Sequence, residues 1–145
     1  MRIYELSHIG EFHVNHNEDF MVSEEAGKSR RLIAVMDGCS SGTDSHFAST
    51  LIGKLLKKIS KQESYREYVK KEIIELKIQL RNIATQLFEE LSNLNRQLDL
   101  KADEILSTLI LAILDIDKYQ AEILIVRETF ISTRIFRYQI FELSD

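Results

Sequence analysis

The sequence contains no proline, only five glycines and a single cysteine in its 145 residues. Complete α/β enzymes have many turns, which normally use both proline and glycine. The scarcity of both residues therefore predicts either a helix-rich chain or an incomplete domain. The single cysteine, Cys39, excludes an internal disulfide framework.

Neither sign of charge dominates the chain. Its 19 basic and 23 acidic residues are interspersed and give a formal net charge of -4. This balance argues against a general nucleic-acid-binding or anionic-membrane surface. The sequence also shows no secretory leader and no apolar run of about 18 residues, the length of a membrane-spanning helix. We therefore expect a cytoplasmic protein with no nucleic-acid or membrane partner.

Length and composition favour one domain. A chain of 145 residues has the usual size of a single domain, and a hydrophobic content of 44% is enough to build one buried core. We therefore expect a single domain over residues 1–145.

The N-terminal part of the chain has the pattern of strands. Arg2–Ile9 alternates loosely between apolar and polar residues and predicts a first strand. Two short apolar runs, Phe20–Ser23 and Leu32–Met36, flank a polar, glycine-containing turn and predict a β-hairpin. The second run is continuous, which is typical of a strand buried on both faces. Such a hairpin would bring Asp19 and Asp37 to neighbouring strand ends.

The period of the apolar residues changes to that of a helix at Ser45. Residues spaced by four predict a first helix from Ser45 to about Lys61. A longer pattern with steps of four and three predicts one helix over Ser64–Leu100, roughly 55 Å long at about 1.5 Å per residue. Packing of its apolar stripe on a sheet is one interpretation, and the seam of a coiled-coil dimer is the alternative. The stripe consists of Val69, Ile73, Leu76, Leu80, Ile83, Leu87, Leu91, Leu94 and Leu98.

The last third of the chain returns to strand character. The apolar run Leu109–Leu114, a turn at Asp115–Lys118 and the segment Glu122–Val126 predict a second hairpin. Phe130–Phe141 interleaves β-branched and aromatic residues with polar ones, as an edge strand would. The order of strand, hairpin, two helices, hairpin and strand predicts an α+β layered sandwich.

Acidic residues stand at the ends of the predicted strands. Asp37 directly follows the run Leu32–Met36 and precedes Gly38, while Glu18 and Asp19 precede the neighbouring strand. Carboxylate and carbonyl oxygens are the ligands that Mg2+ and Mn2+ prefer, whereas Zn2+ prefers cysteine and histidine. The pattern therefore indicates a magnesium or manganese site. The alternative is that these acids are ordinary turn and capping residues.

The order of these motifs resembles that of the protein phosphatase 2C family of metal-dependent serine/threonine phosphatases. The chain has Gly10 followed by a basic residue, here His13, and then Asn17-Glu18-Asp19. A strand, the run AVMDGCSSG and a helix that begins SHFAS come next. In that family, two acidic motifs hold a pair of metal ions that share a bridging water.

The resemblance implies roles for single residues. Asp37 would bridge the metal ions, either Mn2+ or Mg2+, and Gly38 would contribute its carbonyl oxygen. Glu18 or Asp19 would complete the metal shell, directly or through water. His13 would take the place of the family's phosphate-binding arginine, which makes His13 and Asp37 the candidate catalytic residues.

The chain also departs from the family pattern. Arg127-Glu128 stands where family members have Gly-Asp, and the chain ends before the aspartate motifs that supply the remaining ligands of the second metal. The likeness covers roughly the first half of a typical catalytic domain. We therefore expect a partial α+β sandwich of the 2C type, truncated relative to the family, with a pair of long helices packed on the sheet.

The resemblance implies one function and leaves an alternative open. The first is a metal-dependent phosphatase that hydrolyses phosphoserine or phosphothreonine in a phosphorylated protein substrate, with weak or lost activity. The alternative is a non-catalytic phosphatase-like module that forms a homo-oligomer, or binds a partner, through the Ser64–Leu100 helix.

Overall fold

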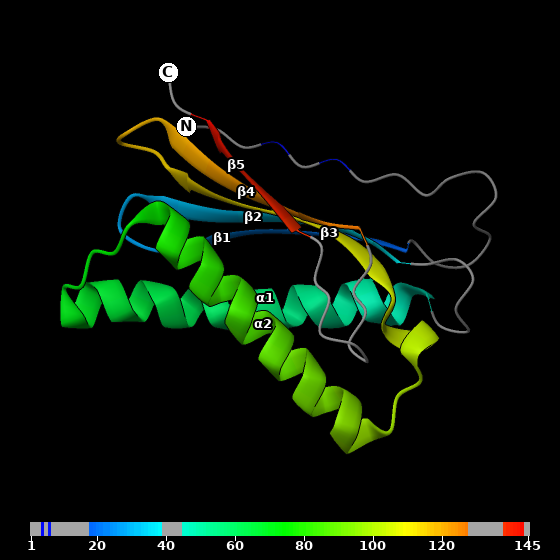
Figure 1. The fold of residues 1–145 in the computed structure, drawn as a ribbon. Coiled ribbons are helices and arrows are strands. Elements are labelled where there is room, and N and C mark those ends of the chain that lie inside the picture. The colour runs from blue at the N-terminus through cyan, green and yellow to red at the C-terminus, as the bar shows by residue number, and fades with distance from the viewer. Residues whose placement is uncertain (1–3, 5, 7–17, 39–44, 128–137, 144–145) are drawn as a thin grey trace.

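The structure, a computed structural model, describes residues 4, 6, 18–38, 45–127 and 138–143 of the chain (Figure 1). Its strands form a five-stranded antiparallel sheet whose spatial order follows the order in the chain. The helices α1 and α2 and the short 3-10 helix η1 connect β2 to β3. The elements are β1 (Asp19–Glu25), β2 (Arg30–Gly38), α1 (Ser45–Lys70), α2 (Leu76–Leu98), η1 (Ala102–Ile105), β3 (Ser107–Asp115), β4 (Gln120–Val126) and β5 (Tyr138–Leu143).

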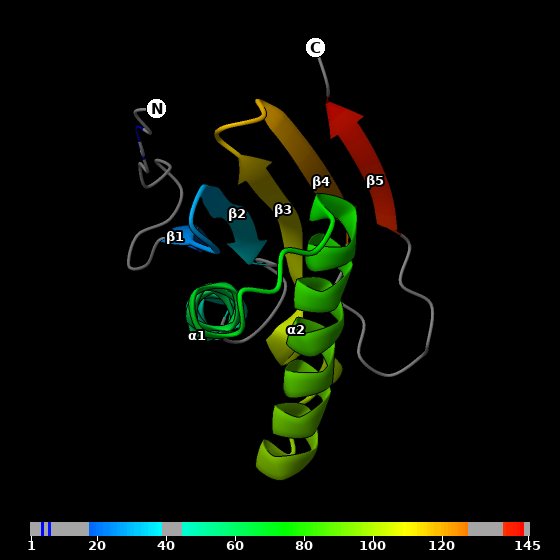
Figure 2. The ribbon, with the colours of Figure 1, turned by 90° about the vertical axis from the view of Figure 1, so that its left-hand side faces the viewer.

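The two long helices lie on the same face of the sheet (Figure 1 and Figure 2). Helix α1 packs mainly against β1 and β2, while α2 packs against β3 and β4. One layer of helices therefore covers one layer of sheet. This arrangement confirms the expected partial α+β sandwich with a pair of long helices packed on the sheet.

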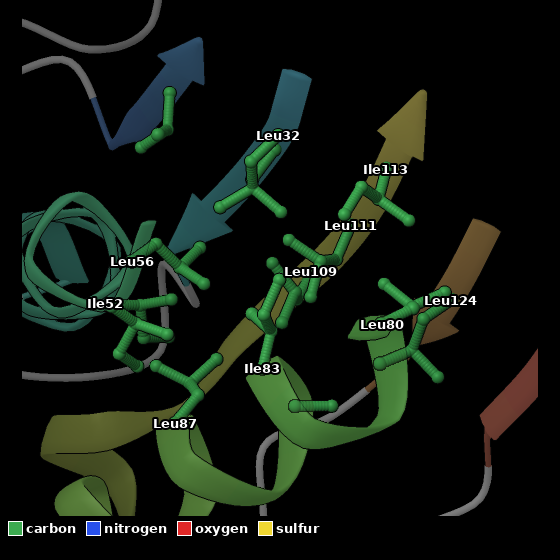
Figure 3. Close-up of a cluster of buried hydrophobic side chains, with 14 of the residues drawn as sticks. Leu32, Ile52, Leu56, Leu80, Ile83, Leu87, Leu109, Leu111, Ile113 and Leu124 are labelled. Carbon is green, nitrogen blue, oxygen red and sulfur yellow. The ribbon is translucent and has the colours of Figure 1, made fainter. Parts of the chain in front are cut away.

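The core fills the space between the two layers. Figure 3 shows its side chains pointing from sheet and helices toward one another. The sheet contributes every second residue of its central strands, because successive side chains in a strand point to opposite faces. These buried residues are Leu32, Leu109, Leu111, Ile113 and Leu124 from the sheet, with Ile52, Leu56, Leu80, Ile83 and Leu87 from the helices.

The first predicted hairpin is confirmed, because β1 and β2 contain the runs Phe20–Ser23 and Leu32–Met36 and pair with each other. Only one face of β2 is buried, however. Met36 is fully buried, whereas 43% of Val35 is exposed. The prediction that this strand is buried on both faces is therefore wrong, because the described helices cover only one side of the sheet.

The second predicted hairpin is confirmed as β3 and β4. The final strand is confirmed in part, since β5 begins at Tyr138 and the earlier residues of Phe130–Phe141 lie outside the described ranges. The predicted first strand, Arg2–Ile9, also lies outside them except for Tyr4 and Leu6, neither of which is in a strand.

The helical pattern over Ser64–Leu100 is not one continuous helix. Helix α1 extends beyond the predicted end and closes at Lys71, which has a φ of 52° and donates its N–H to the Glu67 carbonyl at 3.0 Å. Helix α2 then begins at Leu76. A rod of roughly 55 Å would overhang strands of about 20–30 Å, whereas two separate helices each cover part of the sheet. The prediction of a single long helix is therefore wrong.

Most of the apolar stripe within α2 faces the sheet. Leu80, Ile83, Leu87 and Leu91 are buried in the core. The stripe therefore packs inside the chain, as the first of its two interpretations predicts. No helix in the described part of the chain is long and apolar enough to cross a membrane.

Helix α1 approaches β1 closely at Gly53. A methyl group added at this position would meet the ring of Phe20, the residue that follows Asp19. The Lys57 ammonium lies 5.7 Å from the centroid of the same ring. The glycine and the ring together hold the start of β1 against the helix, and this start carries one of the predicted metal ligands.

Candidate metal site

The β1–β2 hairpin places Asp19 directly opposite Asp37. The Gly38 N–H donates to the Glu18 carbonyl at 3.1 Å, which makes these two residues a hydrogen-bonded pair. In an antiparallel ladder such pairs alternate with non-hydrogen-bonded pairs, whose Cα atoms are about 4.5 Å apart and whose side chains lie closer together. Asp19 and Asp37 form the adjacent pair, which is of this second kind. The hairpin therefore brings two carboxylates together.

Both aspartates belong to the face of the sheet that the helices leave uncovered. Asp37 follows the buried Met36, and Asp19 precedes Phe20, which packs against the core. Because side chains alternate along a strand, the two aspartates lie on the opposite face, and both are exposed. Like charges directly opposite each other in a sheet are destabilising. A cation between the two carboxylates would remove that repulsion.

Strand β3 pairs with the edge of β2 that faces away from β1, and it contacts the backbone of Asp37. Ser107 is buried and pairs with Gly38 in the β2–β3 register. Its hydroxyl oxygen lies 2.9 Å from the Asp37 carbonyl oxygen, to which it donates, and 2.8 Å from the Thr108 carbonyl oxygen. The sequence patterns assigned Ser107 no role at the site. The signal that could have found it is the antiparallel pairing of the two hairpins, which sets the start of β3 beside the end of β2.

Glu18 is not part of the arrangement that Asp19 and Asp37 form. Glu18 immediately precedes β1 and, by strand alternation, belongs to the other face from Asp19. Within the described ranges, no three histidine, cysteine, aspartate or glutamate side chains cluster closely enough to hold a metal ion. Glu18 therefore does not join Asp19 and Asp37 in a three-carboxylate cluster. His13 lies outside the described residues.

The oxygen donors at this position suit a hard divalent cation. The carboxylates of Asp19 and Asp37 and the carbonyl oxygen of Gly38 are donors of the type that Mg2+ and Mn2+ bind, with water completing about six ligands. They do not suit Zn2+, which favours nitrogen and sulfur ligands. Two carboxylates and one carbonyl are enough for a single ion completed by water, and too few for a tightly held pair of ions.

Comparison with models of protein families and with the sequences of characterised proteins finds no match. Comparison with solved structures does find matches. The chain is similar to the PP2C phosphatase domain with a fragment of the regulatory domain of SpoIIE from Bacillus subtilis, with a TM-score of 0.57 and 21% identity. That match covers 88% of this chain and 37% of the SpoIIE chain.

Two further solved structures are similar. RsbX in complex with magnesium matches with a TM-score of 0.53 and 13% identity, over 90% of this chain and 61% of RsbX. PppA, a key regulatory component of T6SS in Pseudomonas aeruginosa, matches with a TM-score of 0.52 and 19% identity, over 89% of this chain and 65% of PppA. This chain thus spans between 37% and 65% of the length of the structures that it matches. At these identities the likeness establishes the fold, and the chain has the α+β fold of part of a protein phosphatase 2C domain.

Proposed function

We propose that this chain is a metal-dependent phosphatase of the 2C type, acting on phosphoserine or phosphothreonine in a protein substrate. The observation that carries the proposal is the pairing of Asp19 with Asp37 on a fold of this type. Two carboxylates on the same face of adjacent strands are a suitable arrangement for Mn2+ or Mg2+. The structure of RsbX is a complex with magnesium, and our proposal extends the use of a divalent cation to this chain.

The proposed roles follow from the position of each residue. Asp19 and Asp37 hold the ion, and the Gly38 carbonyl adds an oxygen ligand. The Ser107 hydroxyl keeps the Asp37 backbone in place through its bond to the carbonyl. A divalent cation supplies a nucleophilic water at neutral pH and neutralises charge on the phosphoryl oxygens. His13 stays a prediction for binding the phosphate.

A non-catalytic phosphatase-like module is the second candidate. The absence of a cluster of three ligating side chains in the described part of the chain favours it. A single ion with few protein ligands would bind weakly and supply only part of the charge neutralisation that phosphoryl transfer needs. Such a module would keep the fold and the acidic pair, and it would act by binding another protein.

Replacing Asp37 with alanine is expected to lower Mn2+-dependent hydrolysis of p-nitrophenyl phosphate by at least about 10–100-fold. Losing residues that merely support metal ligands already costs that much, and Asp37 is proposed to be a ligand itself. The measurement is phosphate release with and without Mn2+. Glu72→Gln is the control, because it removes an exposed carboxylate in the α1–α2 loop, far along the chain from the acidic pair.

Two results would decide against catalysis at this site. If phosphate release needs no metal, or if Asp37→Ala does not change its rate, then another site or a contaminating enzyme catalyses the reaction. No turnover with any metal, together with stabilisation of the chain by Mn2+, would favour the non-catalytic module.

A further inference from the structure

Arg127 lies at the same end of the sheet as the two aspartates. Strand β4 ends at Val126, which stands opposite Leu109 of β3. Partners in an antiparallel ladder are counted in opposite directions, so the next pair of residues is Thr108 and Arg127. Thr108 in turn stands opposite Asp37 in the β2–β3 register. The row that contains Asp37 therefore continues across β3 to the residue that follows β4.

The residues of this row belong to the face of the sheet opposite the helices. Val126 and Leu109 are buried on the other face, on which α1 and α2 pack (Figure 2). Because side chains alternate along a strand, Arg127 and Thr108 belong to the same face as the two aspartates, and both are exposed. Two carboxylates, a hydroxyl and a guanidinium thus come from neighbouring strands at one end of one face.

Arg127 brings positive charge to the acidic end of this face. On strands β1–β4 and at the residue that follows β4, the described positions of the face hold two basic residues, Arg31 and Arg127. Arg31 lies near the start of β2 and Asp37 near its end. At about 3.3 Å per residue these two positions are roughly 20 Å apart. Arg127 is therefore the basic residue of the face that shares an end with the aspartates.

We propose that Arg127 binds the phosphoryl group of the substrate beside Asp19 and Asp37. The inference rests on the proposed phosphatase function. A guanidinium is planar and donates two parallel hydrogen bonds to phosphate oxygens, which suits it to a phosphoryl group. Charge balance also favours a basic residue here. Two carboxylates cancel the charge of one divalent cation, whereas a phosphorylated side chain brings about -1.5 to -2 of its own at neutral pH.

The strand order separates Arg127 from the proposed metal ligands. Adjacent strands are about 4.8 Å apart, so β4 lies about 10 Å from β2, with β3 between them. The long arginine side chain can extend toward an anion over β3, while the short aspartate side chains stay at β1 and β2. The resemblance to the 2C family could not indicate this role, because the family pattern has glycine where this chain has Arg127.

The test is thermal unfolding of the 145-residue chain in Mg2+ over a series of inorganic phosphate concentrations. A ligand that binds the folded state stabilises it, and the dependence on concentration reports the dissociation constant. Arg127→Gln should raise the dissociation constant of phosphate roughly 10–100-fold, because hydrogen bonds between charged groups are among the strongest in proteins. Arg127→Lys should have an intermediate effect, since lysine keeps the charge but not the paired donors.

Arg31→Gln is the matched control, because it removes the same charge from the same face at the other end of the sheet. It should bind phosphate as the wild type does. Mg2+ without phosphate should stabilise the wild type and the three variants equally, since neither arginine is proposed to hold the ion. Circular dichroism checks that each variant is folded, as expected for substitutions at an exposed position such as Arg127.

Phosphate that stabilises Arg127→Gln as strongly as the wild type, or that does not stabilise the wild type, would overturn the inference. Hydrolysis of p-nitrophenyl phosphate tests the proposed function separately. Turnover that depends on Asp37 but not on Arg127 would support the proposed function and overturn the role of Arg127. Phosphate binding that depends on Arg127, without any turnover, would support the role of Arg127 and count against catalysis.

Discussion

Replacing Gln79 with leucine is expected to lower the free energy of unfolding by about 2–4 kcal/mol, because it leaves two buried groups without a hydrogen-bond partner and each such group costs about 1–3 kcal/mol. Gln79 lies in α2 and is 2% exposed. Its Oε1 accepts a hydrogen bond from Arg30 Nη1 at 2.6 Å, and its Nε2 donates to the Ala26 carbonyl at 2.8 Å. Leucine would leave the buried Arg30 guanidinium with Asp115 at 3.8 Å as its ion-pair partner. It would also leave the Ala26 carbonyl without the amide donor.

The control for this prediction is Gln86→Leu, on the same helix. Gln86 donates to the Gln62 side chain at 2.6 Å, but this bond is exposed to solvent. Its loss should change the free energy of unfolding by about 0.5–1 kcal/mol at most, since water replaces the partner. Urea denaturation of both variants measures the difference. Equal losses would mean that the buried network contributes nothing beyond an ordinary surface bond.

Replacing Leu111 with alanine is expected to lower the free energy of unfolding by about 2–5 kcal/mol, the usual range for a leucine removed from a core. Leu111 is fully buried on the central strand β3, beneath the helices (Figure 3). Truncation would leave a cavity that neither layer can close without moving a helix.

Ile110→Ala is the matched control, because this neighbour lies on the face of the sheet opposite the helices and is 48% exposed. Removing its side chain should cost less than half as much, because that side chain is already about half exposed to solvent. Urea denaturation of the two variants under the same conditions provides the comparison. If Ile110→Ala were the more destabilising of the two, the assignment of the buried and exposed faces of the sheet would be incorrect.

Much of the sheet could be predicted from the sequence, because strand patterns depend on neighbouring residues. The runs Phe20–Ser23 and Leu32–Met36 lie either side of a short polar turn, which is enough to specify an antiparallel hairpin. The position of Asp19 opposite Asp37 follows from that pairing, and the structure confirms it. The apolar run Leu32–Met36 could not show how many layers cover the strand, because a strand with one buried face and a strand with two can have the same apolar residues.

The break between the helices could not be predicted from local signals. No proline or glycine interrupts Ser64–Leu100, and the apolar period continues through it. The chain nevertheless turns at Lys71, a non-glycine residue with positive φ. Packing of two helices on one short sheet overrides helix propensity here, and such tertiary effects leave no trace in a short window of sequence.

The candidate site, like the fold, could be predicted from the sequence only in part. The two aspartates could be found because each adjoins an apolar strand. The contribution of Ser107 could be found only by pairing the two predicted hairpins with each other, because Ser107 reaches the Asp37 carbonyl from a strand 70 residues away in the chain. Strand alternation alone could have predicted that the neighbours Glu18 and Asp19 belong to opposite faces of the sheet.

The most direct test of the proposed site is Mn2+ binding measured by thermal unfolding. Ligand that binds only the folded state stabilises it by RT ln(1 + [L]/Kd), which is about 2.7 kcal/mol at 100 times the dissociation constant. The wild type and the control Glu72→Gln should therefore melt at a temperature that rises with Mn2+ concentration. Asp19→Asn and Asp37→Asn should each lose most of this rise. A wild type that Mn2+ does not stabilise, or an Asp37→Asn variant stabilised as much as the wild type, would show that the Asp19–Asp37 pair does not bind the metal.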